Sequence, residues 1–407
     1  MRTRTSRLLH LMLAFALVLG MSGALPALAA AEGGSAETTA TVSVEATSSV
    51  SQETTAAVVK PMADVCKIVS GGATTTFATL EDALAAVTAG QTITLIADIS
   101  DANPVGMDQG FAFTIDKAGF DLTFEGEVDV SNATQVIITG AGALTFDYAL
   151  VVFDTGSKLT VNGEMTCWRL AVVDSGMLVV TGNVTGTYDD PAGWFGFVYT
   201  GGSVTIGGSL GCDSAAFEVW NSGTTLSVGG NITAGGYGIY ADSGSQVTVG
   251  GDVTATGMHA AGVACWAGAD VTVNGNVRSD GVGVWVGPYD TGATATINGT
   301  ITAPTYIMIT DTDGNDVEFT AADFTLPTTL AGYKTYTDGV STVWVKIPVV
   351  DQPPLDLPEN VVPAAPEEGL PAAGDSSNLN LALAAGAAAL AAAAGSCFVL
   401  VLRKRRA

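Results

Sequence analysis

Few residues in this chain have the types and spacing that acid–base or nucleophilic chemistry requires. Asp189 and Asp190 form the one adjacent pair of acids in the central, glycine-rich part of the sequence. They precede Pro191, so a loop turn explains them better than a catalytic pair. His259 is the one histidine outside the first 30 residues, and basic residues are nearly absent around it. We therefore predict no catalytic residue and expect that the protein is not an enzyme.

The sequence also argues against a metal or cofactor site. The segment Asp311–Asp316 has the composition of a calcium loop. An EF-hand loop, however, has Gly at its sixth position and Glu at its twelfth, where this chain has Asp316 and Ala322. A hairpin turn between the apolar segments 307–309 and 317–319 explains these residues better. We expect no bound metal and no cofactor.

Aromatic side chains are the remaining candidates for a binding site. Trp220, Tyr240, Trp266 and Trp285 each lie near a turn rich in Asp, Asn, Ser or Gly, in four successive segments of similar pattern. If they face solvent, they form a stripe on which sugar rings could stack. If they pack on one another, they form an aromatic ladder that is partly core and binds nothing. The second interpretation is the simpler one, and the four residues are candidate ligand-binding residues under the first.

Charge and composition limit what such a site can recognise. The 407 residues include 40 acidic and 15 basic side chains, for a formal net charge of −25. Between residues 31 and 374 there are 39 acidic and eight basic side chains. Nucleic acid, whose phosphates require a basic surface, is therefore excluded as a partner. Fifty glycines argue against a helical bundle, and 47% hydrophobic residues argue against a fully disordered chain.

A short unit, apolar–x–apolar–x–Gly, recurs through the central region. Successive units are 19 to 26 residues apart, with a mean of about 23, which is typical of a solenoid. The units are Leu159–Gly163, Leu178–Gly182, Val204–Gly208, Leu226–Gly230, Val247–Gly251, Val271–Gly275 and Ala295–Gly299.

Each repeat holds three short segments with alternating apolar residues, separated by Gly- and Asp-containing turns. About 23 residues leave no room for a crossover helix, so each repeat must be one coil whose strands stack in parallel on the next coil. The predicted fold is an all-β parallel β-helix over residues 66–346. A short helix over 77–87 and the segments 306–310, 316–320 and 343–347 are expected to cover its two ends.

This region resembles the right-handed parallel β-helix superfamily, which includes pectin-degrading enzymes and adhesin-like surface proteins. The Asn-Thr-Asp, Gly-Asp-Asp, Gly-His-Gly and Arg-Ile-Lys motifs of the polygalacturonases are absent from this chain. The resemblance therefore implies the fold and not the catalysis.

The cysteine positions predict buried free thiols in this fold. Cys167 and Cys212 occupy matching places in coils that are two steps, or ~9.6 Å, apart, which exceeds the reach of a disulfide. Cys265 alternates with Val263 and is expected to point inward with it.

The two ends of the chain carry export signals. Residues 1–29 combine Arg2, Arg4 and Arg7, an apolar run and a small-x-small cleavage site, which is typical of a secretory signal peptide. Residues 379–402 are uncharged and long enough to span a membrane as a helix, and basic residues follow at 403–406.

The order of pentapeptide, apolar helix and basic tail over 370–407 resembles the sorting signal of Gram-positive cell-wall-anchored proteins. The pentapeptide is Leu370, Pro371, Ala372, Ala373 and Gly374. The resemblance implies that a sortase cuts before Gly374 and joins Ala373 to peptidoglycan. The family usually has Thr where this chain has Ala373, so a simple membrane anchor is the alternative.

Two linkers are expected on either side of the β-helix. Residues 30–65 are rich in Thr, Ser, Ala and Glu and predict a disordered stalk, and residues 347–369 form a Pro-rich wall spacer. The sequence as a whole predicts an exported surface protein that acts as an adhesin or display rod and binds a glycan or host receptor. A polysaccharide lyase or hydrolase on the same fold and a purely structural spacer are the alternatives.

Overall fold

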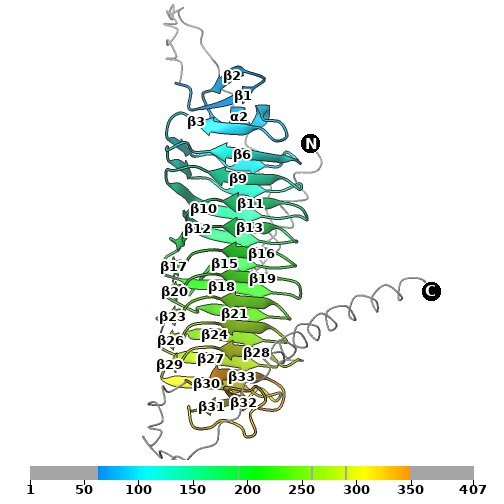
Figure 1. Cartoon of the computed structure of the whole chain (residues 1–407), viewed down its shortest axis with the longest axis vertical. Helices are drawn as coiled ribbons and strands as arrows, with labels where there is room; N and C mark the ends of the chain where they lie inside the picture. Colours follow the sequence, from blue (N-terminus) through cyan, green and yellow to red (C-terminus); the bar gives the residue numbers. More distant parts are fainter. Residues whose placement is uncertain (1–62, 191, 258–259, 289–290, 349–407) are drawn as a thin grey trace, which may run out of the picture. The chain divides into compact units, whose positions relative to one another are not determined.

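The computed structural model describes residues 63–190, 192–257, 260–288 and 291–348, which form a parallel β-solenoid (Figure 1). The predicted signal peptide and sorting signal, nearly all of both linkers and His259 lie outside these residues. The coil that starts at β19 (Thr225–Val228) continues through β20 (Ile232–Ala234) and β21 (Ile239–Asp242) before the next coil begins. This confirms the prediction of an all-β parallel solenoid, and most coils hold the expected three short strands.

The strands of successive coils stack into three parallel layers, here called faces 1, 2 and 3. Face 1 comprises β3 (Thr92–Leu95), β6 (Ala112–Asp116), β9 (Gln135–Thr139), β11 (Lys158–Val161), β13 (Met177–Val180), β16 (Ser203–Ile206), β19, β22 (Gln246–Val249), β25 (Asp270–Val273), β28 (Thr294–Ile297) and β33 (Thr342–Lys346). Face 2 comprises β4 (Ile99–Asp101), β7 (Leu122–Phe124), β14 (Val184–Gly186), β17 (Leu210–Cys212), β20, β23 (Val253–Ala255), β26 (Val277–Ser279) and β29 (Ile301–Thr302). Face 3 comprises β5 (Val105–Met107), β8 (Val128–Val130), β15 (Trp194–Val198), β18 (Ala215–Trp220), β21, β24 (Ala261–Trp266), β27 (Val282–Gly287) and β30 (Thr305–Thr310).

Two long strands, β10 (Leu144–Val152) and β12 (Met165–Val172), run through both face 2 and face 3. The first three residues of β10 pair with β7, and its last three residues pair with β8. Most strands turn alternate side chains inward, so that Leu226 and Val228 of β19 are buried while Ser227 faces outward. The inward residues form one continuous apolar core.

The repeated glycines are required because the coils approach each other closely at the turn between faces 1 and 2. A Cβ atom on Gly229 would lie 2.4 Å from the carbonyl oxygen of Gly207, and one on Gly250 would lie 2.1 Å from that of Gly229. Real Cβ atoms do not come this close to another heavy atom. Gly229 and Gly250 are the fourth residues of their apolar–x–apolar–x–Gly units. The closing glycines of the same two units, Gly230 and Gly251, are also tightly placed, since a Cβ atom on either would lie 2.9 Å from the carbonyl group of the preceding coil's closing glycine. Coil stacking therefore requires glycine at both positions of these units.

A ladder of side-chain hydrogen bonds follows the same turn from coil to coil. Asn231 Oδ1 accepts from the backbone N–H of Asp252 at 2.8 Å, and Asp252 Oδ1 accepts from that of Asn276 at 2.7 Å. Asn276 Oδ1 in turn accepts from the N–H of Thr300 at 2.9 Å. Each coil thus satisfies a backbone donor of the next, which fixes the register of the stack.

The four cysteines of the solenoid are buried free thiols, as predicted. Gly186 stands between Cys167 and Cys212 in the register of face 2, so that one coil separates the two sulfur atoms. Burial raises the pKa of both thiols to about 12. Because the thiolate is the reactive form, these cysteines serve packing and not chemistry.

Antiparallel strands and a short helix lie at the two ends of the stack. At the N-terminal end, β1 (Cys66–Ser70) pairs antiparallel with β2 (Ala73–Phe77) and β3, and helix α2 (Leu80–Ala86) buries Leu80 and Leu84. At the C-terminal end, β31 (Asp316–Phe319) pairs antiparallel with β30, and β32 (Tyr333–Thr337) with β33.

The β30–β31 pairing confirms the predicted hairpin at the acidic segment 311–316. The backbone N–H groups of Asp313 and Asn315 donate to Asp311 Oδ1, and hydrogen bonds from Asn315 hold the pKa of Asp311 below its usual range. The Asp311 carboxylate therefore has a structural partner within the turn.

Candidate functional site

Face 3 carries a band of aromatic side chains on its outer surface, separate from the core. We call this band the aromatic face. Eleven of its rings lie on the strands of face 3 or in the bends that lead into them, and most are exposed or half-buried. They are Tyr148, Trp168, Tyr188, Trp194, Phe197, Tyr199, Trp220, Tyr237, Tyr240, Trp266 and Trp285.

The four predicted aromatic residues all belong to this face, but they do not form a single stripe. In the strand register, Tyr240 and Trp285 both pair with Ala264 and so share one row. Trp220 pairs with Asp242 and Trp266 with Gly287, which places both in the adjacent row. Trp220 is 36% exposed, whereas Trp266 is only 7% exposed. One of the four rings is therefore buried, and the other three reach the surface.

Trp266 and Trp285 support each other through direct ring packing. Their ring centroids are 5.3 Å apart with an edge-to-face geometry. Gly287 makes room for the Trp266 ring, since a Cβ atom there would lie 2.0 Å from its Cζ3 atom. The Trp285 indole Nε1 donates a hydrogen bond of 2.9 Å to Thr310 Oγ1. Trp285 is thus held in a fixed orientation at the surface.

Trp194 and Tyr237 belong to the same cluster, and sequence reasoning missed them. The centroid of Trp194 lies 5.7 Å from that of Tyr237 and 5.9 Å from that of Tyr240. Both residues follow the loops between faces 2 and 3, whose lengths vary from coil to coil, so the glycine repeat did not place them. Trp194 is the first residue of β15 and Tyr237 lies two residues before β21, so an aromatic residue at or just before the start of these two strands is the signal that could have found them.

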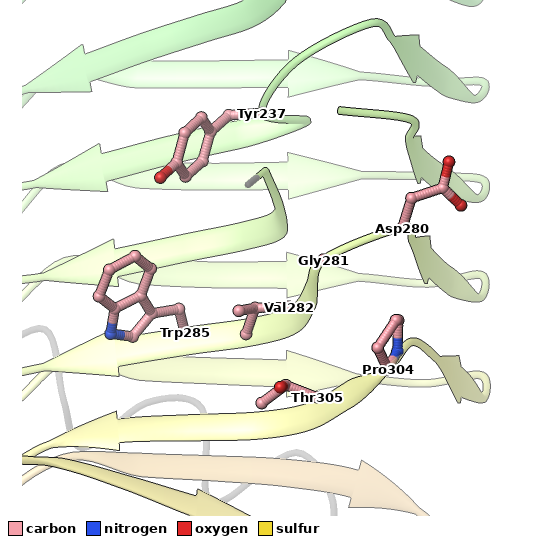
Figure 2. A pocket seen from close by; sticks show the side chains of 7 residues that line it. All are labelled: Tyr237, Asp280, Gly281, Val282, Trp285, Pro304 and Thr305. Atoms are coloured by element: carbon pink, nitrogen blue, oxygen red, sulfur yellow. The ribbon is translucent and has the colours of Figure 1, made fainter. Parts of the chain in front are cut away.

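A groove of about 520 Å³ opens beside this cluster. Figure 2 shows the rings of Tyr237 and Trp285 at one end of the groove and Asp280 and Pro304 toward the other. Gly281, Val282 and Thr305 complete its lining. Burial raises the pKa of the Tyr237 hydroxyl, so this group stays protonated and able to donate a hydrogen bond.

A second cluster of the aromatic face surrounds Arg169. Its guanidinium carbon lies 4.4 Å from the ring centroid of Tyr188 and 5.1 Å from that of Phe197. Its Nε donates to the backbone oxygen of Trp194 at 3.2 Å. These cation–π contacts stabilise the arginine on the face and explain why one basic residue is found in so acidic a region.

Two carboxylates near the aromatic face, those of Asp242 and Glu218, have structural partners. Asp242 accepts hydrogen bonds from Tyr240 Oη at 3.3 Å and Ser243 Oγ at 2.9 Å. Burial raises the pKa of Glu218, which lies between Phe197 and Tyr240 in the register. Neither residue lines the groove beside Trp285.

The Asp189–Asp190 pair belongs to a turn, as predicted from the sequence. Asp190 Oδ1 accepts from the N–H of Ala192 at 3.0 Å, and the Asp190 carbonyl accepts from Gly193. Within the described ranges, no group of three or more His, Cys, Asp or Glu side chains is arranged to hold a metal ion.

Comparisons with known proteins leave the family open. No protein-family model, no curated protein and no solved structure matches this chain significantly. In the part of the chain that the structure describes, no helix is both long and apolar enough to cross a membrane, and residues 379–402 lie outside that part.

Proposed function

We propose that this protein is an exported surface protein, anchored to a Gram-positive cell wall, whose aromatic face binds a carbohydrate without cleaving it. The observation that carries this proposal is the gathering of aromatic rings outside a solenoid whose core is complete without them. Large rings at a surface carry a cost in exposed apolar area unless a partner covers them. A chain of sugar rings, with apolar C–H faces and polar edges, is a partner of matching shape and chemistry.

The solenoid gives this face the rigidity that carbohydrate binding requires. Its strands are hydrogen-bonded on both sides by neighbouring coils, and Trp285 is fixed by Trp266 and Thr310. A preorganised surface loses little conformational entropy when a ligand binds.

We also propose that residues 1–29 direct export of the protein and that Ala373 becomes attached to the cell wall.

Removing rings from the aromatic face is expected to abolish glycan binding while the fold is retained. On a glycan array, the Trp220→Ala/Trp285→Ala double variant should bind at least tenfold more weakly, because buried aromatic anchors dominate binding energies. Trp344→Ala is the matched control, since Trp344 lies on β33 of face 1 and its Nε1 donates to Thr329. Equal binding by wild type and the double variant would show that the glycan binds away from these two rings, and no binding by wild type would support a structural spacer instead.

Wall attachment through Ala373 predicts release of the protein by muramidase. After digestion of the wall, the chain should migrate with peptidoglycan fragments attached and without residues 374–407. Ala373→Thr, which restores the residue usual in sorting signals, should increase the released fraction. Recovery of the intact chain in the detergent-soluble membrane alone would contradict sortase cleavage and favour a membrane anchor.

A further inference from the structure

We infer that the groove beside Trp285 binds an oligosaccharide that carries amino groups, with a sugar ring stacked on Trp285 and an ammonium group near Asp280. This inference rests on the proposed function and adds a substrate class and a binding site to it. It is drawn from the combination of a fixed aromatic platform, a groove that leads away from it and an exposed carboxylate at the far end.

The aromatic end of the groove offers two rings at a defined spacing. Tyr237 precedes β21 and Trp285 lies on β27, so the two rings come from coils that are two steps, or ~9.6 Å, apart. Figure 2 shows both rings on the same side of the solenoid. Rings at this separation can contact two units of one glycan chain.

The groove has a volume of about 520 Å³, within the range of sites that hold a small organic ligand. Asp280 lies at the bend between β26 and β27, and Trp285 lies on β27 itself. The backbone N–H of Asp280 donates to the Ala255 oxygen at 3.0 Å and Val282 N–H to Ala260 O at 3.0 Å, which ties this segment to the preceding coil. The polar end of the groove is therefore held at a constant distance from the aromatic end.

Charge selects among the possible sugars. Among the residues that the structure describes, the exposed Asp280 carboxylate is the one charged group that lines the groove, and the chain as a whole has a net charge of −25. Such a surface attracts cations and repels polyuronates or sulfated glycans. Arg169 is placed on β12 and does not line this groove. An amino-bearing glycan complements both ends of the site.

The inference is tested by titration calorimetry of the full chain with three probes: a glucosamine oligosaccharide with free amines, its N-acetylated form and an oligogalacturonate. We expect the aminated probe to bind tightest and the oligogalacturonate weakest. Asp280→Asn should weaken binding of the aminated probe two- to fivefold, which is the range expected for loss of an exposed ion pair. The affinity for the acetylated probe should not change. Higher salt should reduce the difference in affinity for the aminated probe between wild type and Asp280→Asn.

Asp213→Asn is the matched control. Asp213 is exposed and directly follows β17, as Asp280 directly follows β26, so both occupy the same corner of their coils. This variant should bind all probes as wild type does. Trp285→Phe, which keeps a ring in place, should weaken binding of both the aminated and the acetylated probe. Its circular dichroism signal should stay native.

The outcomes separate this inference from the proposed function. Equal effects of Asp280→Asn on the aminated and acetylated probes, or tightest binding of the oligogalacturonate, would overturn the amino-glycan assignment while carbohydrate binding stands. Binding of none of the probes, together with a blank glycan array, would overturn both.

Discussion

The Gly250→Ala variant is expected to lose about 3 kcal/mol of its free energy of unfolding, although alanine adds only one methyl group. The new Cβ atom would lie 2.1 Å from the Gly229 carbonyl oxygen, which is backbone and cannot rotate away. Two coils must therefore separate, which lengthens the hydrogen bond of 2.7 Å from Gly250 N–H to Val228 O. Urea unfolding followed by circular dichroism measures the change.

Gly211→Ala is the control for this prediction. Gly211 lies in the middle of β17, and a Cβ atom there meets nothing within 4 Å. Neither Gly211 nor Gly250 has a positive φ, so alanine strains neither backbone. Gly211→Ala should leave stability unchanged within about 0.5 kcal/mol or raise it slightly. A similar loss in both variants would show that the coil contact is not the reason for glycine at position 250.

Phe217→Ala is expected to destabilise the protein by about 4 kcal/mol, whereas Trp220→Ala on the same strand should cost about 1 kcal/mol or less. Phe217 points inward from β18, is fully buried and packs against Phe195 with ring centroids 5.8 Å apart. Gly196 makes space for this ring, so its loss leaves a cavity that the backbone cannot close. Trp220 points outward from the same strand.

The comparison of these two variants separates stability from binding. Thermal or urea unfolding should distinguish Phe217→Ala from wild type, and glycan binding should distinguish Trp220→Ala. A large loss of stability in Trp220→Ala would mean that the aromatic face is part of the folding core and would weaken the case for a binding surface.

The coil architecture could be predicted because stacking leaves a strict signal in the sequence. Glycines such as Gly229 and Gly250 are forced by contact with the previous coil, and the inward Val and Leu residues by the narrow core. The burial of Cys265 could be predicted because this residue alternates with the inward-pointing Val263. The hairpin at 307–319 could be predicted because the acidic segment between its strands lacks the Gly and Glu that a calcium loop requires.

The aromatic face was harder to predict because no repeat fixes it. The loops between faces 2 and 3 differ in length, so the register of Trp194 and Tyr237 relative to Trp285 could not be counted from the glycines. β15 also places two buried residues, Phe195 and Gly196, in succession, which breaks the alternation on which a prediction depends. The antiparallel β1–β2 pair carries no apolar alternation in its outer strand, where Ala73 to Thr76 are exposed.

The side-chain ladder at the turn between faces 1 and 2 has an evolutionary consequence. Asn231, Asp252 and Asn276 perform the same task in successive coils, each toward the coil that follows. A gene segment encoding one coil can therefore be duplicated or lost, and the flanking coils will join through the same contacts. Such an event would change which aromatic rings become neighbours while leaving the core intact. The binding surface can therefore change among descendants of this protein while the fold stays the same.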